Sequence, residues 1–139
     1  MEEQEIIKGN VSISEFMGAS VFYESDIFFT EIKREYAQFE AGNNPNPHTD
    51  VGTKKQTSEL SYHQRWEWIM PVVEKISLEH DISISSVGMW ACYITRSDSD
   101  YKDSIADFGG FEPMIMNVWN CVVKYIQWRN KQPKYKQNG

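Results

Sequence analysis

The sequence predicts an α+β fold, and three patterns indicate that class. Apolar residues recur at helical spacing over about 61–80 and again over about 112–130. Between these ranges, apolar and polar residues alternate along 82–96, and the polar turn that follows predicts a second strand ending near 107. Two long amphipathic helices packed on a small antiparallel hairpin (about 82–107) form a layered architecture, so we expect a single domain over 1–139.

The N-terminal part predicts shorter elements. Ser12 and Glu15 have the spacing of a capping box, which predicts a short helix that ends at Gly18. Residues 19–23 predict a short strand. Apolar residues recur every three or four positions over 26–39, which predicts a helix there.

Residues 42–59 contain two prolines, two glycines and three asparagines, and we expect a long polar loop. Ser61 and Gln64 match a capping box that would start the helix over 61–80. The inner stripe of this helix is expected to contain Trp66, Ile69, Met70, Val73 and Ile76, widened by Trp68 and Val72. The basic tail of the chain is 129–139, after the last helix.

Charge and cysteine usage narrow the class of protein. The net charge is −6, which does not favour nucleic acid as a partner and favours basic surfaces instead. Cys92 and Cys121 lie in apolar stretches and are expected to be buried free thiols. The acidic start lacks the pattern of a signal peptide, and no apolar run approaches membrane-spanning length. We therefore expect a cytoplasmic protein with no membrane contact.

Motifs for catalysis or metal binding are not found in the sequence. His48, His63 and His80 are scattered without the spacing of metal ligands. The aspartates around Asp98 lack the glycine and the glutamate of a calcium loop. No nucleophile elbow or phosphate-binding loop occurs. We expect no metal, no cofactor and no catalytic residue, while an enzyme whose site forms only in the folded chain stays an alternative.

Three surfaces are candidates for binding, and the first is the loop at 42–59. Trp66 and Trp68 lie about 200° apart around a helix, so one of them is expected to be exposed as an interface anchor. The turn at 97–107 adds acidic side chains: Asp98, Asp100, Asp103 and Asp107. The alternative is nucleic-acid binding by the tail through Trp128, Arg129, Lys131, Lys134, Tyr135 and Lys136. The simpler interpretations are a second hydrophobic cluster, a solvated acidic turn and a solvated tail.

Three segments carry a resemblance to a known family. They are ISEFMG at 13–18, YHQRWEWIMPVVEKI at 62–76, and the closing helix over 112–128 with VWN at 118–120 and VVKYI at 122–126. The chain resembles a family of small bacteriophage and prophage proteins with a Y-H-x-x-W-x-W-x-M-P-V-V-E-K-I helix, which is similar to the phage ABA sandwich group. The resemblance implies a phage or mobile-element origin and an ABA-sandwich-like domain, but it supplies no catalytic residue. The long stretch between Gly18 and Tyr62 departs from the family pattern.

Together these observations predict a non-catalytic phage-type accessory protein that acts by protein–protein binding in the cytoplasm of a host bacterium. The expected partner is a host protein, and an anti-CRISPR-like inhibitor of a nucleic-acid-processing defence enzyme fits the acidic charge. The alternatives are a nucleic-acid-binding accessory factor that uses the basic tail, and an enzyme.

Overall fold

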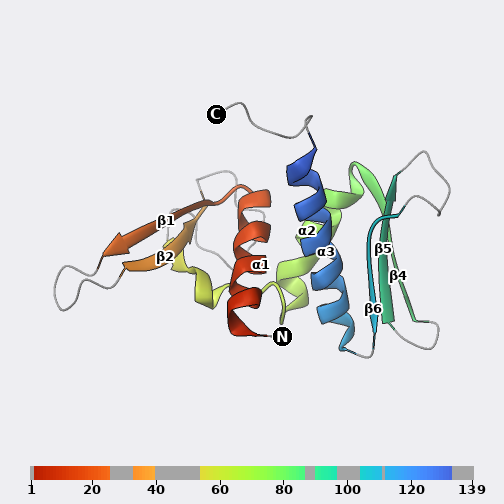
Figure 1. Cartoon of the computed structure of the whole chain (residues 1–139), viewed down its shortest axis with the longest axis horizontal. Coiled ribbons are helices and arrows are strands. Elements are labelled where there is room, and N and C mark those ends of the chain that lie inside the picture. Colours follow the sequence, from red (N-terminus) through yellow and green to blue (C-terminus); the bar gives the residue numbers. More distant parts are fainter. Residues whose placement is uncertain are drawn as a thin grey trace. The chain divides into compact units, whose positions relative to one another are not determined.

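The structure is a computed structural model that describes residues 2–25, 33–39, 54–86, 90–96, 104–110 and 112–132. The described elements are three α-helices, one 3-10 turn and two three-stranded antiparallel sheets (Figure 1). The α+β class is therefore confirmed. The chain divides into two compact units, residues 1–62 and 63–139, which are described separately. The prediction of a single domain stays a prediction.

Unit 1 begins with helix α1 (Glu3–Phe16), which starts nine residues earlier than the predicted cap at Ser12. Its first turn contains Glu3 and Glu5, whose charges suit the positive end of the helix dipole. Its end is as predicted, because Gly18 has a φ of 101°. The Gly18 amide donates to the Glu15 carbonyl and the Ala19 amide to the Ser14 carbonyl, a Schellman pattern that favours glycine.

The sheet of unit 1 has the order β1 (Ser20–Ser25), β2 (Lys33–Gln38) and β3 (Lys54–Gln56). The predicted strand at 19–23 is confirmed by β1. The predicted helix over 26–39 is wrong for 33–38, because cross-strand pairing with β1 outweighs an ambiguous apolar spacing. Residues 26–32 lie outside the described part.

The predicted loop over 42–59 is wrong at its C-terminal end. Strand β3 and a 3-10 turn, η1 (Thr57–Glu59), occupy 54–59. The Thr57 hydroxyl donates to the Glu35 carboxylate at 2.8 Å, which links η1 to β2. Residues 42–53 lie outside the described part.

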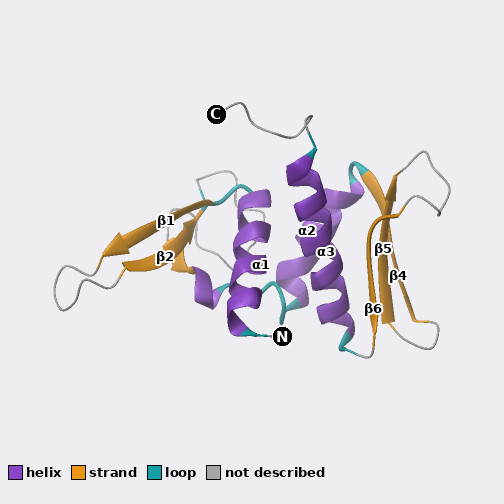
Figure 2. Cartoon of the chain, in the orientation of Figure 1, coloured by secondary structure: helices purple, strands orange, loops and turns teal. Residues whose placement is uncertain are grey.

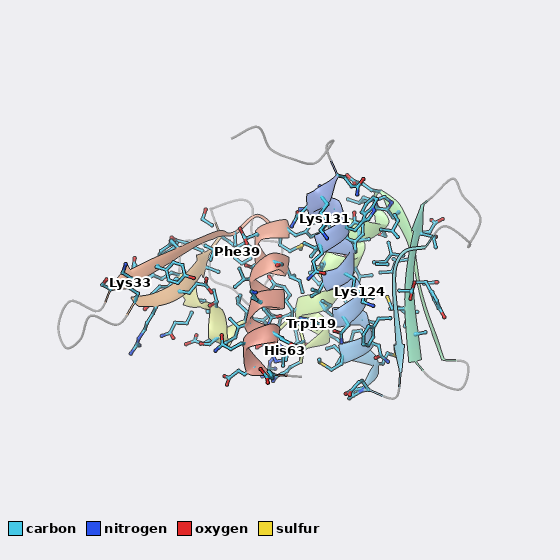
Figure 3. All side chains as sticks on the ribbon, viewed as in Figure 1. Lys33, Phe39, His63, Trp119, Lys124 and Lys131 are labelled. Carbon is cyan, nitrogen blue, oxygen red and sulfur yellow. The ribbon has the colours of Figure 1, made fainter. Side chains whose placement is uncertain are left out.

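The core of unit 1 contains a buried amide. The Asn10 side chain, on α1, donates to the Leu60 carbonyl at 3.0 Å, and both residues are buried. Ile13 and Phe39 are buried as well. Figure 3 shows Phe39 at the end of β2 nearest α1 and Lys33 at the far end of the strand. The end of β2 next to Phe39 is therefore the end that lies at the core.

Unit 2 contains α2 (Trp66–Ser77), β4 (His80–Ser86), β5 (Trp90–Arg96), β6 (Ser104–Gly110) and α3 (Met114–Lys131). The strand order is β4-β5-β6, with every neighbouring pair antiparallel. Helices α2 and α3 lie on the same face of this sheet, as the colouring by secondary structure shows (Figure 2). No described element of unit 2 lies on the opposite face.

The predicted hairpin over about 82–107 has two strands, whereas the structure has a three-stranded sheet of β4, β5 and β6. The range 82–96, expected as one strand, is divided between β4 and β5, which pair Ile82 with Ile94 and Ile84 with Cys92. Strand β6 then adds to the other edge of β5 and extends beyond 107. Residues 87–89 lie outside the described part.

The predicted helix over 61–80 is shorter at both ends. The Ser61 hydroxyl donates to the Glu59 carbonyl at 3.2 Å, so it does not cap the helix, and 62–64 form a turn. The inner face of α2 is also rotated from the predicted stripe. Its buried residues are Trp68, Ile69, Val72, Val73 and Ile76, while Trp66 and Met70 are exposed.

We predict that Ile69→Ala lowers the free energy of unfolding by about 2–5 kcal/mol, because Ile69 is 0% exposed and its truncation leaves a cavity. The matched control is Met70→Ala, next in sequence but 40% exposed, which should cost less than about 1 kcal/mol. Urea denaturation followed by circular dichroism measures both. Equal costs for the two variants would contradict the described orientation of α2.

We also predict that Asn10→Ala lowers the stability of unit 1 by about 1–3 kcal/mol, because the buried Leu60 carbonyl loses its donor. The control is Ser14→Ala on the same helix. The Ser14 hydroxyl only donates to Val11 within α1, so its loss should change stability little. Hydrogen exchange of the α1 amides reports both variants, and equal protection in the two would argue against a structural role of Asn10.

Candidate functional site

The exposed face of α2 contains the first candidate surface. Trp66 is 36% exposed and Trp68 is 4% exposed, so Trp66 is the exposed member of the pair. Met70 lies one turn after Trp66 and is 40% exposed. Arg65 and Glu67 form an exposed ion pair at 3.5 Å beside them. We call Trp66 and Met70 the α2 surface; it is an apolar pair with charged neighbours.

The acidic candidates are only partly described. Asp98, Asp100 and Asp103 lie outside the described residues. Asp107 lies on β6, is exposed, and pairs directly with Tyr93 on β5, which is also exposed. Ala106 is buried and faces the helices, so alternation along β6 places Asp107 on the face of the sheet opposite to them.

That opposite face has acidic and hydroxyl character in its described part. Tyr93 on the central strand pairs with Asp107 on β6 and with Ser83 on β4, so the three lie in one row across the sheet. Asp81 lies two residues before Ser83 on β4 and therefore on the same face. Asp81 and Ser83 are both exposed. These residues, with Tyr93 and Asp107, form the surface that we call the open sheet face.

The residues of the basic tail do not form one described surface. Lys134, Tyr135 and Lys136 lie outside the described part, whereas Arg129 and Lys131 belong to the last turn of α3. The ring of Trp128 lies 6.0 Å from that of His80, edge to face, and 6.0 Å from that of Tyr125. Trp128 is thus packed in an aromatic cluster of the protein itself, which limits its use for stacking on a base.

Both cysteines are buried free thiols, as expected. The Cys121 thiol donates to the carbonyl oxygens of Cys92, at 3.3 Å, and of Ala106, at 3.6 Å. Hydrogen bonding with Cys92, together with burial, raises the pKa of Cys121. A thiol with a raised pKa stays protonated near neutral pH and is a poor nucleophile.

The described histidines are part of aromatic packing. The His63 ring lies 6.5 Å from that of Trp119 on α3 (Figure 3), and burial lowers the pKa of His63. The His80 ring lies 5.3 Å from that of Tyr125. His48 lies outside the described residues. Among the residues that are described, no three His, Cys, Asp or Glu side chains are grouped so that they could hold a metal ion.

None of the described helices combines the length and apolar character needed to cross a bilayer.

Sequence reasoning missed two aromatic surfaces. Tyr93 is exposed beside Asp107, and the alternation along 90–96 already placed it opposite Cys92 and Ile94. Phe22 and Tyr36 are stacked across β1 and β2 with ring centroids 6.0 Å apart. That pair was not found because 26–39 had been expected to form a helix, which separates the two side chains.

Comparison of the chain with models of protein families, with curated proteins and with solved structures found no match.

We predict that neither cysteine reacts with Ellman's reagent in the native protein at pH 8, and that both react after unfolding in guanidinium chloride. The reason is burial of both thiols and the raised pKa of Cys121. Ser77→Cys is the control, because Ser77 is exposed on α2 and its replacement should react at once. Rapid native labelling of the wild-type protein would contradict the described packing.

Proposed function

We propose that this chain is a non-catalytic, phage-type accessory protein that acts by binding a host protein. The α2 surface carries the proposal. Tryptophan is one of the side chains most enriched at the hot spots of protein interfaces, and Trp66 is 36% exposed on a helix. Met70, one turn away, adds an adaptable apolar contact.

The charge of the protein indicates the chemistry of the partner. The chain has a net charge of −6, and the open sheet face contributes Asp81 and Asp107 around Tyr93. Acidic surfaces of this kind associate with basic ones, and their long-range field speeds the encounter. A nuclease keeps a basic groove for nucleic acid, so a nucleic-acid-processing defence enzyme is the partner that we propose, with inhibition of the anti-CRISPR type as the result.

The resemblance to phage proteins supports the same proposal. Trp66, Trp68 and Met70 all belong to the 62–76 segment that carries it. The order of α2, the strands β4–β6 and α3 is the element order that the resemblance implies, and this order, with both helices on one face of the sheet, is the ABA-sandwich-like feature that we propose.

The two alternatives have less support. Nucleic-acid binding by the tail would use Trp128, whose ring is packed against His80 and Tyr125. An enzyme needs a nucleophile or acid–base pair, and the buried, protonated Cys121 does not supply a nucleophile.

We predict that the full chain, used as bait in a nuclease-treated lysate of the host, captures one protein in stoichiometric amount. Trp66→Ala combined with Met70→Ala should weaken that complex by about 30-fold or more, the effect of losing a hot spot. Leu78→Ala is the control, because Leu78 is 84% exposed just beyond α2 and outside the α2 surface.

The captured protein should then lose its nuclease activity when the wild-type chain is added, and keep it when the double variant is added. A complex that survives the double substitution would refute the role of the α2 surface. Capture that vanishes with nuclease treatment would shift the function to nucleic-acid binding.

A further inference from the structure

One face of the sheet in unit 1 contains two aromatic rings that are not part of the core. Phe22 on β1 and Tyr36 on β2 are directly paired, with ring centroids 6.0 Å apart and ring planes inclined by 27°. Both side chains are only half-buried. The two rings are stacked on one another across the sheet, and we call this aromatic pair the platform.

This platform lies on the less covered side of the sheet. Alternation places Ala37 and the following Phe39 on the opposite side, and both are buried. On the platform side, no described residue is buried: the strands place there Ser20, Phe22, Glu24, Arg34, Tyr36, Gln38, Lys54 and Gln56. The platform is therefore accessible in the described part of the unit.

The sheet is also locally basic in an acidic protein. Strands β1, β2 and β3 contain four cations, Lys33, Arg34, Lys54 and Lys55, and only two carboxylates, Glu24 and Glu35. Their net charge is +2, against −6 for the whole chain. Arg34 and Lys54 lie on the platform side.

Lys54 connects the charge to the rings. Its ammonium group lies 4.7 Å from the centroid of the Tyr36 ring and also forms an ion pair with Glu24 across the sheet. The two charged side chains are 44% and 45% exposed, and such exposed pairs contribute little stability. A phosphate can therefore replace the Glu24 carboxylate without disturbing the fold.

We propose that the platform face of β1–β2–β3 binds single-stranded nucleic acid. A base extends the stack of Phe22 and Tyr36, and Arg34 and Lys54 contact the phosphates, a combination of stacking and charge that suits single strands. Gln56 lies on the same face, where its amide donates to and accepts from base edges. An acidic peptide would use the cations but would leave the stacked rings unused.

This activity is separate from the proposed protein-binding function, which uses α2. A protein with both surfaces would hold a nucleic-acid strand on unit 1 while α2 contacts its protein partner.

The test is fluorescence anisotropy of a labelled mixed-sequence single-stranded oligonucleotide titrated with the full chain at several salt concentrations. At 50 mM salt we expect a dissociation constant of about 1–100 µM that weakens steeply as salt rises, because counterions are released on binding. Tyr36→Leu should weaken binding about tenfold through lost stacking, and Tyr36→Phe should retain it. Arg34→Gln should reduce the slope of log K against log salt by about 1.

A variant that binds the oligonucleotide more tightly is the strongest check, because an unfolded variant would lose affinity instead. Glu24→Gln removes the carboxylate that competes with phosphate for Lys54, so this variant should bind several-fold more tightly. Lys8→Gln on α1 and Tyr93→Leu on β5 are matched controls, because both residues are exposed and neither belongs to the platform; they and the double variant at Trp66 and Met70 should bind as the wild type does.

Four results would overturn the proposal. They are no binding at about 100 µM protein in low salt, unchanged affinity of Tyr36→Leu and Arg34→Gln, loss of binding on replacing Lys134 and Lys136 by Gln, and preference for an acidic peptide over the oligonucleotide. The third result would assign the binding to the basic tail.

Discussion

The close approach of helix α3 to strands β5 and β6 is the contact on which the rest of unit 2 depends. It is made by small side chains. The Cys121 thiol lies at hydrogen-bonding distance from the carbonyl oxygens of Cys92 and Ala106, and all three residues are buried. A longer side chain at position 121 would separate the helix from the sheet and open a gap along the layer. This contact also determines which face of the sheet is covered, and hence that Tyr93 and Asp107 lie on the other one.

Unit 1 contains two polar contacts that join distant segments of the chain. The amide of Asn10 reaches the carbonyl of Leu60, fifty residues later in the chain, and Thr57 reaches Glu35. Both contacts join segments that local sequence cannot bring together. Buried polar groups contribute less to stability than apolar packing, but they require one arrangement, since any other leaves a group unsatisfied. In this unit they hold η1 and β2 in place, and with them the sheet that carries Phe22 and Tyr36.

Local patterns predicted the elements that depend on local chemistry. The end of α1 at Gly18, the strand after it, the range of α3 and the buried thiols all follow from neighbouring residues. Residues 33–38 were misassigned because apolar spacing of three and four fits a helix as well as a paired strand. The start of α2 was placed too early because Ser61 uses its hydroxyl on Glu59. For residues 33–38 the deciding partner is the distant strand β1, whereas for Ser61 it is a residue two positions earlier in the sequence.

The same limit applies to the candidate sites. The angle between Trp66 and Trp68 predicted that only one of them is buried, but the choice depends on how α2 is rotated against its sheet. Of the acidic candidates, only Asp107 lies in the described part. The platform of Phe22 and Tyr36 was out of reach of sequence reasoning, because it exists only once β1 and β2 are paired in their observed register. Pairing across strands is a long-range property that single-sequence patterns do not contain.

The open sheet face contains positions at which this protein can accept substitutions at little cost in stability. Asp81, Ser83, Tyr93 and Asp107 point away from the helices, whereas Cys92, Ile94 and Ala106, their neighbours along the strands, are buried. Substitutions at the outward positions alter surface chemistry without altering core volume, so selection can vary them nearly independently of stability. The chemistry of this surface can therefore change one residue at a time while the core stays the same.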